Sequence, residues 1–427
     1  MKKFVKFRAF VIAGIVFLLS CGSRDPIETF REFNLTVSSE KLMITLSWDS
    51  VSDDDLTGYN LYRSVGDGEL GLYKALGVID TSYVDSSVSS DIVYGYQITA
   101  SFAGGRESDP SEEERIIPGP TITWVFDASS AQLVKMTHDV AHRTGDVFNN
   151  LFSVAAFDVD ENTGNIYLLD RFERSLILLR EGKDPLVLTG GDGSIRRFDT
   201  PTDISYDSFR DEFWITGGSA GSIYHFVKDD TNKYTFADSF NTGGDAAEGQ
   251  LDAEGDFWVV NNKQNSIVIY SRESGFQRIT VGGFSGNDIM LALDEIRGLA
   301  YAANRSNGDF YRITAFGVKT PLPSLNGVIL GAVEPSAGDL WLILDDNGNG
   351  SYDLAKLSEE GSRIITLEDR YSEKPTWIGV NPFNSNVVVM DVASSGASIE
   401  VFTGTGERLS SFGSFNQPLM GRILLER

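Results

Sequence analysis

A nine-residue segment near residue 350 places oxygen-bearing side chains at alternating positions. Its sequence is DDNGNGSYD, and side-chain oxygens fall at positions 1, 3, 5 and 9 counted from Asp345. Alternating oxygens can converge on one hard cation such as Ca²⁺, and Gly350 at position 6 permits the tight turn that this requires. We therefore expect a calcium site with the ligands Asp345, Asn347, Asn349, Ser351 (through its carbonyl) and Asp353.

The spacing of this segment resembles the calcium loops of EF-hand-like proteins and of integrin-type propeller repeats. The resemblance implies that a bound calcium ion would stiffen one loop. Two positions that carry Asp or Asn in such loops are Asn here, which supplies less charge, and Lys356 stands at position 12, where an EF-hand has Glu. The alternative is an Asn/Gly-rich turn between two strands.

Residues suited to catalysis are few, because the chain has three His and one Cys. His138 and His142 form HDVAH, whose spacing could place two imidazoles on one helical face. The zinc-protease motif needs a Glu in the second position, and no third ligand is visible in the sequence. We therefore expect a solvated loop or a short helix there, and a packed strand residue at His225. No catalytic residue is predicted.

The chain begins with a short basic and apolar segment. Four cations lie among the first eight residues, and 11 apolar residues follow at Ala9–Leu19. As a helix this run would cover about 16 Å, which is too short for a hydrocarbon core of about 30 Å. The pattern is that of a secretion signal, and we expect residues 1–20 to be removed as a signal peptide.

The end of this segment, LLSCG, resembles the lipobox of bacterial lipoproteins, with Cys21 as the residue to be acylated. The resemblance implies a covalent lipid on Cys21, a tether at residues 21–30 and a location in the cell envelope. Gly22 resembles the residue of lipoproteins that are sorted to the outer membrane. Two or more acyl chains are needed for stable anchoring. The alternative is an ordinary signal whose cysteine is incidental.

Composition limits the classes of partner. The chain is 41% hydrophobic and 23% charged, which is typical of a folded protein, and its formal charge is −25. Removal of residues 1–20 takes away four of the 36 cations, so the mature charge is 32 − 61 = −29. This charge repels phosphate backbones, and we expect no nucleic-acid partner.

Residues 31–118 show the alternating apolar pattern of half-buried strands. The runs LSW, GYNLYRS, TSYVD and YGYQITA together resemble a fibronectin type III domain, which is an immunoglobulin-like sandwich. The resemblance implies that Trp48 lies in the core, that Tyr96 ties a strand to a neighbouring loop, and that the domain acts as a spacer without catalysis. The sequence Ile117-Pro-Gly-Pro120 then marks a linker.

Residues 121–427 contain a repeat with a mean length of 44 residues. An aromatic or apolar anchor recurs within a strand at spacings of 43, 47, 44, 43, 40 and 47 residues. The seven anchors are Trp124, Tyr167, Trp214, Trp258, Tyr301, Trp341 and Val388. Units of this length predict an all-β propeller with seven blades, and six is the alternative. Because the first unit lacks an innermost strand, we expect Pro418–Leu425 to supply it and close the ring.

The units loosely resemble NHL-type repeats, which implies the fold and little about function. We expect a lipid-anchored, non-catalytic envelope protein whose propeller binds a protein or glycan through its loop face. The alternatives are an NHL-like lyase or lactonase that uses an axial metal, and a purely structural envelope protein. An exposed aromatic patch on the loop face would favour binding. The sequence identifies neither the ligand-binding residues nor the oligomeric state.

Overall fold

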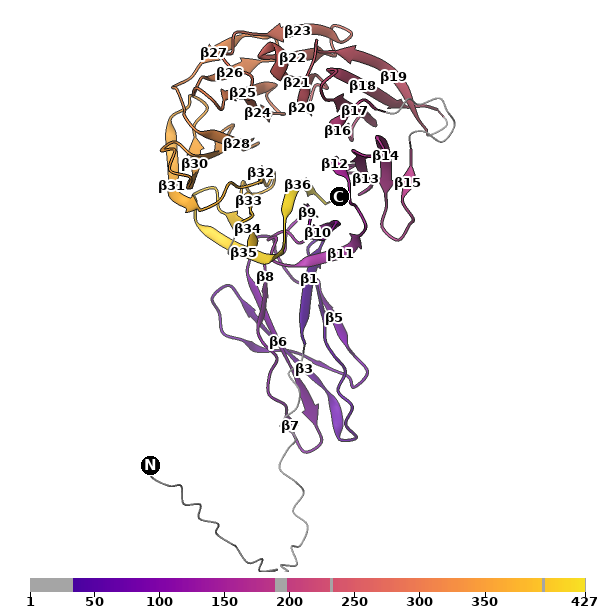
Figure 1. Cartoon of the computed structure of the whole chain (residues 1–427). Coiled ribbons are helices and arrows are strands. Elements are labelled where there is room, and N and C mark those ends of the chain that lie inside the picture. The colour runs from indigo at the N-terminus through magenta and orange to yellow at the C-terminus, as the bar shows by residue number, and fades with distance from the viewer. Residues whose placement is uncertain (1–33, 189–197, 231–232, 394–395, 427) are drawn as a thin grey trace, which may run out of the picture.

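The computed structural model describes residues 34–188, 198–230, 233–393 and 396–426, which form strands joined by turns (Figure 1). The 3-10 helix η1 at Asn262–Gln264 is the only helical element among them. Within the same ranges, no helix is long and apolar enough to cross a membrane. The predicted signal peptide, the lipid on Cys21 and the tether lie outside the described residues.

The N-terminal domain is a sandwich of two antiparallel sheets, as predicted. One sheet has the order β1-β2-β5 and the other the order β4-β3-β6-β7, with β8 also paired to β6. The strands are β1 (Thr36–Glu40), β2 (Met43–Ser47), β3 (Leu56–Val65), β4 (Gly71–Leu76), β5 (Ser82–Asp85), β6 (Tyr94–Phe102), β7 (Arg106–Glu107) and β8 (Glu114–Ile116). Trp48 lies in the core between the sheets, against Tyr59.

Tyr96 joins the two sheets through a buried carboxylate. Its hydroxyl donates to Asp85 Oδ2 over 2.8 Å, and Arg63 forms an ion pair of 2.8 Å with the same oxygen. The tyrosine therefore binds a side chain of the opposite sheet. Burial by itself would raise the pKa of Asp85, but Arg63 and the hydrogen bonds outweigh it and hold the pKa at about 2.

The second domain consists of seven four-stranded sheets arranged around a central axis (Figure 1). Blade 1 has β36 (Pro418–Leu425), β9 (Thr121–Asp127), β10 (Gln132–Met136) and β11 (Arg143–Phe148). Blade 2 has β12 (Val154–Val159), β13 (Ile166–Asp170), β14 (Ser175–Leu179) and β15 (Leu186–Val187). Blade 3 has β16 (Pro201–Asp207), β17 (Glu212–Gly217), β18 (Ser222–Lys228) and β19 (Tyr234–Asn241).

The remaining four blades follow the same order from the axis outward. Blade 4 has β20 (Ala246–Leu251), β21 (Phe257–Asn261), β22 (Ser266–Ser271) and β23 (Gln277–Val281). Blade 5 has β24 (Ile289–Asp294), β25 (Leu299–Asn304), β26 (Phe310–Thr314) and β27 (Lys319–Pro321). Blade 6 has β28 (Val328–Val333), β29 (Leu340–Leu344), β30 (Tyr352–Leu357) and β31 (Arg363–Tyr371). Blade 7 has β32 (Trp377–Val380), β33 (Val387–Asp391), β34 (Ala397–Phe402) and β35 (Arg408–Phe415).

The seven-blade prediction is confirmed, and so is closure by the C-terminal strand. β36 pairs antiparallel with β9, and Leu424 lies opposite Ile122 in that pairing. All seven repeat anchors lie in the second strand of their blades and are at most 2% exposed. The anchors therefore fill the space between neighbouring sheets, which explains why the repeat requires a large apolar side chain there.

The two domains meet at a polar joint formed by the β10–β11 turn. Lys135 on β10 lies 2.8 Å from Glu40 of β1 and 3.4 Å from Glu426 at the C-terminal end. His138 Nε2 lies 3.1 Å from Asp91 of the sandwich. Lys135 is buried, and a buried charge stabilises a joint only when it is paired, as this one is with Glu40 and Glu426.

The structure corrects our expectation for HDVAH, which is neither solvated nor helical. His138 is only 5% exposed, because it lies between the sandwich and blade 7. His142 Nε2 lies 2.7 Å from the carbonyl oxygen of Arg115, at the end of the sandwich. Val140 adopts a left-handed conformation with φ of 55°, which forms a turn in place of a helix.

Closure of the ring can be tested with Leu424→Ala. Leu424 is 2% exposed and packs between blades 1 and 2, so its truncation should destabilise the propeller by about 2–4 kcal/mol. Leu409→Ala on β35 is the matched control, since Leu409 is 44% exposed and should change stability by less than about 0.5 kcal/mol. Denaturant unfolding measures both. Equal effects of the two variants would contradict closure by β36.

The hydrogen bond from Tyr96 to Asp85 predicts that the stability of the sandwich depends on pH. Because the pKa of Asp85 is lowered in the fold, its contribution of about 2 kcal/mol is complete above about pH 4 and disappears as the pH falls through about 2. Asp85→Asn should remove it at pH 7, whereas the exposed Asp67→Asn should not. Hydrogen exchange of the β5 and β6 amides measures this contribution to the stability of the sandwich. If the difference in stability between the wild type and Asp85→Asn were the same at pH 2 as at pH 7, this explanation would be refuted.

Candidate functional site

The propeller has two faces that differ in their connections. The loop face carries the connections between blades and the turns between the second and third strands of each blade; the turn face carries the other turns. The joint with the sandwich lies at the turn face, since it uses the β10–β11 turn and Asn384 of the β32–β33 turn. The sandwich leaves the ring at its rim and does not cover the central opening (Figure 1).

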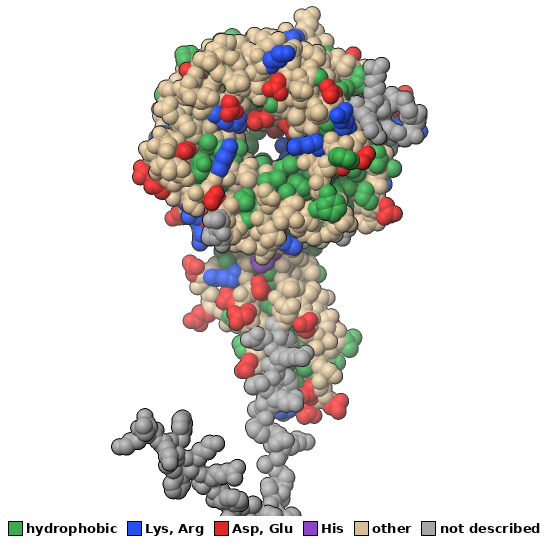
Figure 2. Space-filling model, viewed as in Figure 1, with side chains coloured by type: hydrophobic (Ala, Val, Ile, Leu, Met, Phe, Trp, Pro, Cys, Tyr) green, Lys and Arg blue, Asp and Glu red, His purple; other side chains and the backbone are tan. Residues whose placement is uncertain are grey.

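A channel of about 650 Å³ runs along the axis between the innermost strands. One side of its lining, on blades 2 to 5, is acidic. Asp294 lies in this lining but is paired with Arg297. The other carboxylates on this side, which we call the acidic arc, belong to Asp158, Glu161, Asp203, Glu248 and Glu295. Figure 2 shows acidic side chains along one side of the central hollow and hydrophobic ones along the other.

Backbone N–H groups of the next blade hold three carboxylates of the acidic arc in place. Asp158 Oδ2 accepts from the amide of Tyr206 over 2.8 Å, and Asp203 Oδ2 accepts from that of Gly249 over 3.0 Å. Glu248 accepts in the same way from Leu291. Each acid therefore links two neighbouring innermost strands, which is a structural role as well as a source of channel charge.

Three carboxylates of the acidic arc, those of Asp203, Glu248 and Glu295, have raised pKa values. Desolvation by the surrounding blades is the largest cause, even though 42% of the Glu248 side chain is accessible and Glu295 is exposed. It raises the pKa of Asp203 to about 7, with a further contribution from the charges of Glu248 and Asp158. Enclosure raises the pKa of Glu248 and Glu295 in the same direction. The carboxylates therefore repel one another.

The opposite side of the channel, on blades 6, 7 and 1, is apolar and contains the half-buried Trp377. A Cβ atom at Gly379 or Gly421 would collide with or crowd the indole, so the two glycines let the ring lie against the backbones of β32 and β36. Met420 and Ile423 also line this side, next to Arg422. Arg422 Nε forms an ion pair of 2.9 Å with Asp158 across the boundary.

Two phenylalanines protrude from the loop face at blade 2. Phe152, in the connection from β11 to β12, is 82% exposed, and Phe172, in the β13–β14 turn, is 81% exposed. Their backbones adjoin, because the amides of Arg171 and Phe172 donate to Ser153. The sequence contains no signal for this pair, since the two residues lie in separate connections and only the fold brings them together.

The predicted calcium ligands lie on the loop face, in the β29–β30 turn. Asn349 Oδ1 accepts from the amide and hydroxyl of Ser351, over 2.9 and 2.7 Å. Both side chains also contact Asp369 of β31, which the sequence spacing could not indicate. Asp345 Oδ1 is buried without a hydrogen-bond partner, as an atom reserved for a cation would be.

These residues fit calcium in part. The unpartnered oxygen of Asp345 and the carboxylate of Asp369 could serve as calcium ligands. Asn349 and Ser351, in contrast, already form hydrogen bonds with each other. Across the described ranges, no three His, Cys, Asp or Glu side chains are placed together so that they could hold a metal ion. Calcium therefore remains a prediction.

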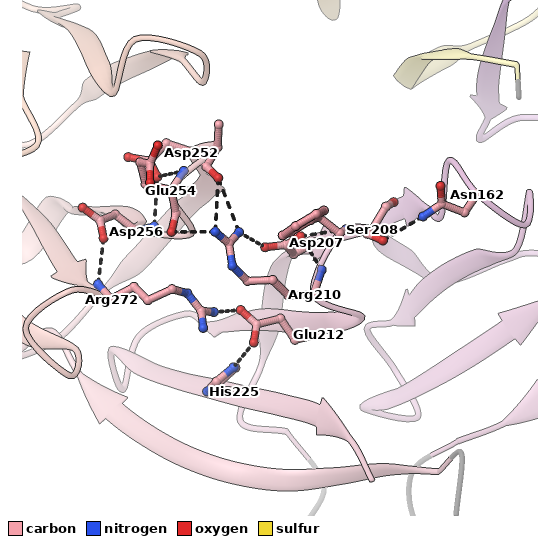
Figure 3. A network of polar contacts seen from close by, with 12 residues as sticks. Asn162, Asp207, Ser208, Arg210, Glu212, His225, Asp252, Glu254, Asp256 and Arg272 are labelled. Atoms are coloured by element: carbon pink, nitrogen blue, oxygen red, sulfur yellow. Dashed lines mark hydrogen bonds and ion pairs between the residues drawn. The ribbon is translucent and has the colours of Figure 1, made fainter. Parts of the chain in front are cut away.

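His225 is a packed strand residue, as expected, within the polar network of Figure 3. Its ring stacks on Trp214 with centroids 4.1 Å apart, and Nε2 lies 3.2 Å from Glu212 Oε2. Arg272 contacts the other oxygen of Glu212. Burial lowers the pKa of His225 to about 4, so the imidazole is neutral near pH 7. The network joins blades 3 and 4 below the surface.

Comparisons with known proteins support the fold. No protein-family model matches the chain. A stretch of 112 residues, 26% of the chain, is 35% identical to an amylopullulanase from Thermoanaerobacterium thermosulfurigenes and 34% identical to one from Thermoanaerobacterium saccharolyticum. The match spans only 6% and 8% of the length of those relatives.

Two solved structures resemble the chain more extensively. A protein from Lactobacillus plantarum is 11% identical with a TM-score of 0.53, covering 71% of this chain and 99% of that one. A functionally unknown protein from Desulfotomaculum acetoxidans DSM 771 is 11% identical with a TM-score of 0.54, covering 72% and 99%. A virginiamycin B lyase from Staphylococcus aureus has 12% identity and a TM-score of 0.46, with coverage of 64% of this chain and 95% of that one. The first two likenesses show the propeller fold alone.

The calcium prediction can be tested by thermal unfolding. At ~1 mM Ca²⁺ the melting temperature of the propeller should rise by about 2 °C, as expected for a site of submillimolar affinity. Asp345→Ala should abolish the rise. Asp346→Asn is the control, because Asp346 pairs with Arg363 and is not a predicted ligand. The prediction fails if the wild type shows no shift, or if Asp345→Ala shifts equally.

Proposed function

We propose that this protein is a lipid-anchored protein of the cell envelope, held at the outer membrane by the lipid on Cys21. The sandwich acts as a spacer of the fibronectin type III kind. The propeller binds a protein or glycan partner through its loop face, without catalysis. The mature charge of −29 disfavours nucleic acid as a partner.

The exposed pair Phe152 and Phe172 carries this proposal. A single exposed phenylalanine is ordinary, but two on adjoining backbone segments place two exposed apolar rings in one region of the loop face, as at interaction sites. Burial of each ring against a partner would contribute about 1.5–3 kcal/mol. Aromatic side chains are enriched at the centres of protein interfaces, and their flat faces can also stack on a sugar ring.

The position of the joint supports the same proposal. Lys135, His138 and Asn384 fix the sandwich at the turn face, so the spacer does not obstruct Phe152 and Phe172 on the loop face. A membrane anchor at the far end of the sandwich would then hold the propeller away from the lipid surface.

A propeller enzyme is the second candidate, because the acidic arc gathers carboxylates in the axial channel. The pKa of about 7 at Asp203 would suit a group that exchanges protons near neutral pH. A metal-dependent lyase or lactonase would also need convergent metal ligands, and the described residues show no such group of three His, Cys, Asp or Glu. The exposed aromatic pair makes binding the better supported function.

Crosslinked co-purification from intact envelopes tests the proposal. The wild-type chain should enrich a specific protein or glycan, and Phe152→Ala with Phe172→Ala should reduce the recovery at least tenfold. The control is Phe209→Ala with Phe316→Ala, which removes two phenylalanines that are 90% and 81% exposed on the turn face. Mass spectrometry identifies protein partners and glycan analysis identifies sugars. The proposal is wrong if no partner is enriched, or if both double variants lose it equally.

A further inference from the structure

We propose that the axial channel binds a small organic cation, an ammonium or guanidinium group carried on an apolar body. This inference concerns a different site from the aromatic pair on the loop face and does not depend on it. It rests on three features of the channel: its volume, its acidic arc and the tryptophan on the opposite side.

The channel has the size of a ligand site. Its volume of about 650 Å³ lies within the range of about 300–1,000 Å³ typical of small-molecule pockets. The innermost strands form its walls, and their positions are fixed by four-stranded sheets on all sides. The site is therefore preformed, so a ligand would not have to order a mobile loop.

The charge of the lining selects a cation. Arg422 is the cationic side chain in the lining, and it is already paired with Asp158 at 2.9 Å. Arg305 reaches Glu248 from a loop-face turn at 3.5 Å but lies closer to Asp288, at 2.7 Å. Among the described residues, neither Asp203 nor Glu295 forms an ion pair, and Arg422 acts on Glu295 only through its charge. Mutual repulsion within the arc would therefore be relieved by an entering positive charge.

Trp377 provides an independent reason to expect an organic cation. The indole is half-buried on the apolar wall, and Gly379 and Gly421 leave the space that lets it lie there. A tryptophan face attracts ammonium and guanidinium groups, and aromatic side chains are a recurring way of binding organic cations. The apolar residues beside it, Met420 and Ile423, would cover the carbon skeleton of the same ligand.

The spacing of the acids disfavours a bare metal ion. The acidic arc extends over four blades, and no three carboxylates of the described chain converge as metal ligands. A compact ion requires several oxygens at about 2.0–2.6 Å. An organic cation spreads its charge over a larger surface and needs only a negative field on one side and an apolar contact on the other.

Isothermal titration of the full chain tests this inference with two probes of similar shape, phenethylammonium and its neutral counterpart 2-phenylethanol. We expect the cation to bind at least tenfold more tightly than the alcohol. Glu248→Gln with Glu295→Gln should weaken binding of the cation at least tenfold and leave binding of the alcohol unchanged. Trp377→Leu should weaken binding of both probes.

The control is Glu254→Gln with Glu360→Gln, which removes two exposed acids outside the channel. It should leave the affinity for phenethylammonium within twofold of the wild type, and a melting curve of each variant confirms that it is folded. The proposal is overturned if the cation gives no binding at 10 mM, if both probes bind equally, or if the control weakens binding as much as the channel variant.

Discussion

The pairing of β36 with β9 is the interaction on which the rest of the propeller depends. It joins segments almost 300 residues apart and places Arg422, Met420 and Ile423 on the channel wall. Without β36, blade 1 would have no innermost strand, and β9 would expose its hydrogen-bonding edge. The channel exists as an enclosed space because this strand completes its circumference.

The same strand also secures the sandwich. Glu426, directly after β36, accepts a hydrogen bond from the amide of Lys41 in the sandwich over 2.8 Å and lies near the buried Lys135. The segment that closes the ring, β36 with Glu426, therefore also attaches the sandwich to the propeller. A second set of interactions is repeated around the axis, where Asp158 and Asp203 each accept a hydrogen bond from a backbone amide of the following blade. These hydrogen bonds offset part of the cost of crowding acids in the channel.

The sequence was sufficient to predict the architecture because the constraints behind it are periodic. One large buried anchor per blade, such as Trp214 or Trp258, produced a regular spacing, and the missing first strand pointed to residues 418–425. Assignment of the sandwich to the fibronectin type III family stays a prediction, as does the lipid on Cys21.

The candidate sites were harder to predict, for physical reasons. The acids at 158, 203, 248 and 295 recur at 45, 45 and 47 residues, close to the repeat length, and this periodicity could have revealed the acidic arc. Strands near them alternate and bulge, so the sequence alone does not say which acids face the axis. The joint at His138 and the pair Phe152 and Phe172 depend on contacts between distant segments and have no local signal.

Disulfide trapping between β9 and β36 is the most direct test of ring closure by the C-terminal strand. In a Cys21→Ser background, Thr123→Cys and Ile423→Cys would place two thiols opposite each other on β9 and β36, at the separation of directly paired residues in an antiparallel sheet. Mass spectrometry of the oxidised chain should find an intramolecular disulfide between positions 123 and 423 in most molecules. The out-of-register pair, Thr123→Cys with Leu425→Cys, should give little. No disulfide between 123 and 423, or equal yields from the two pairs, would contradict closure of the ring by β36.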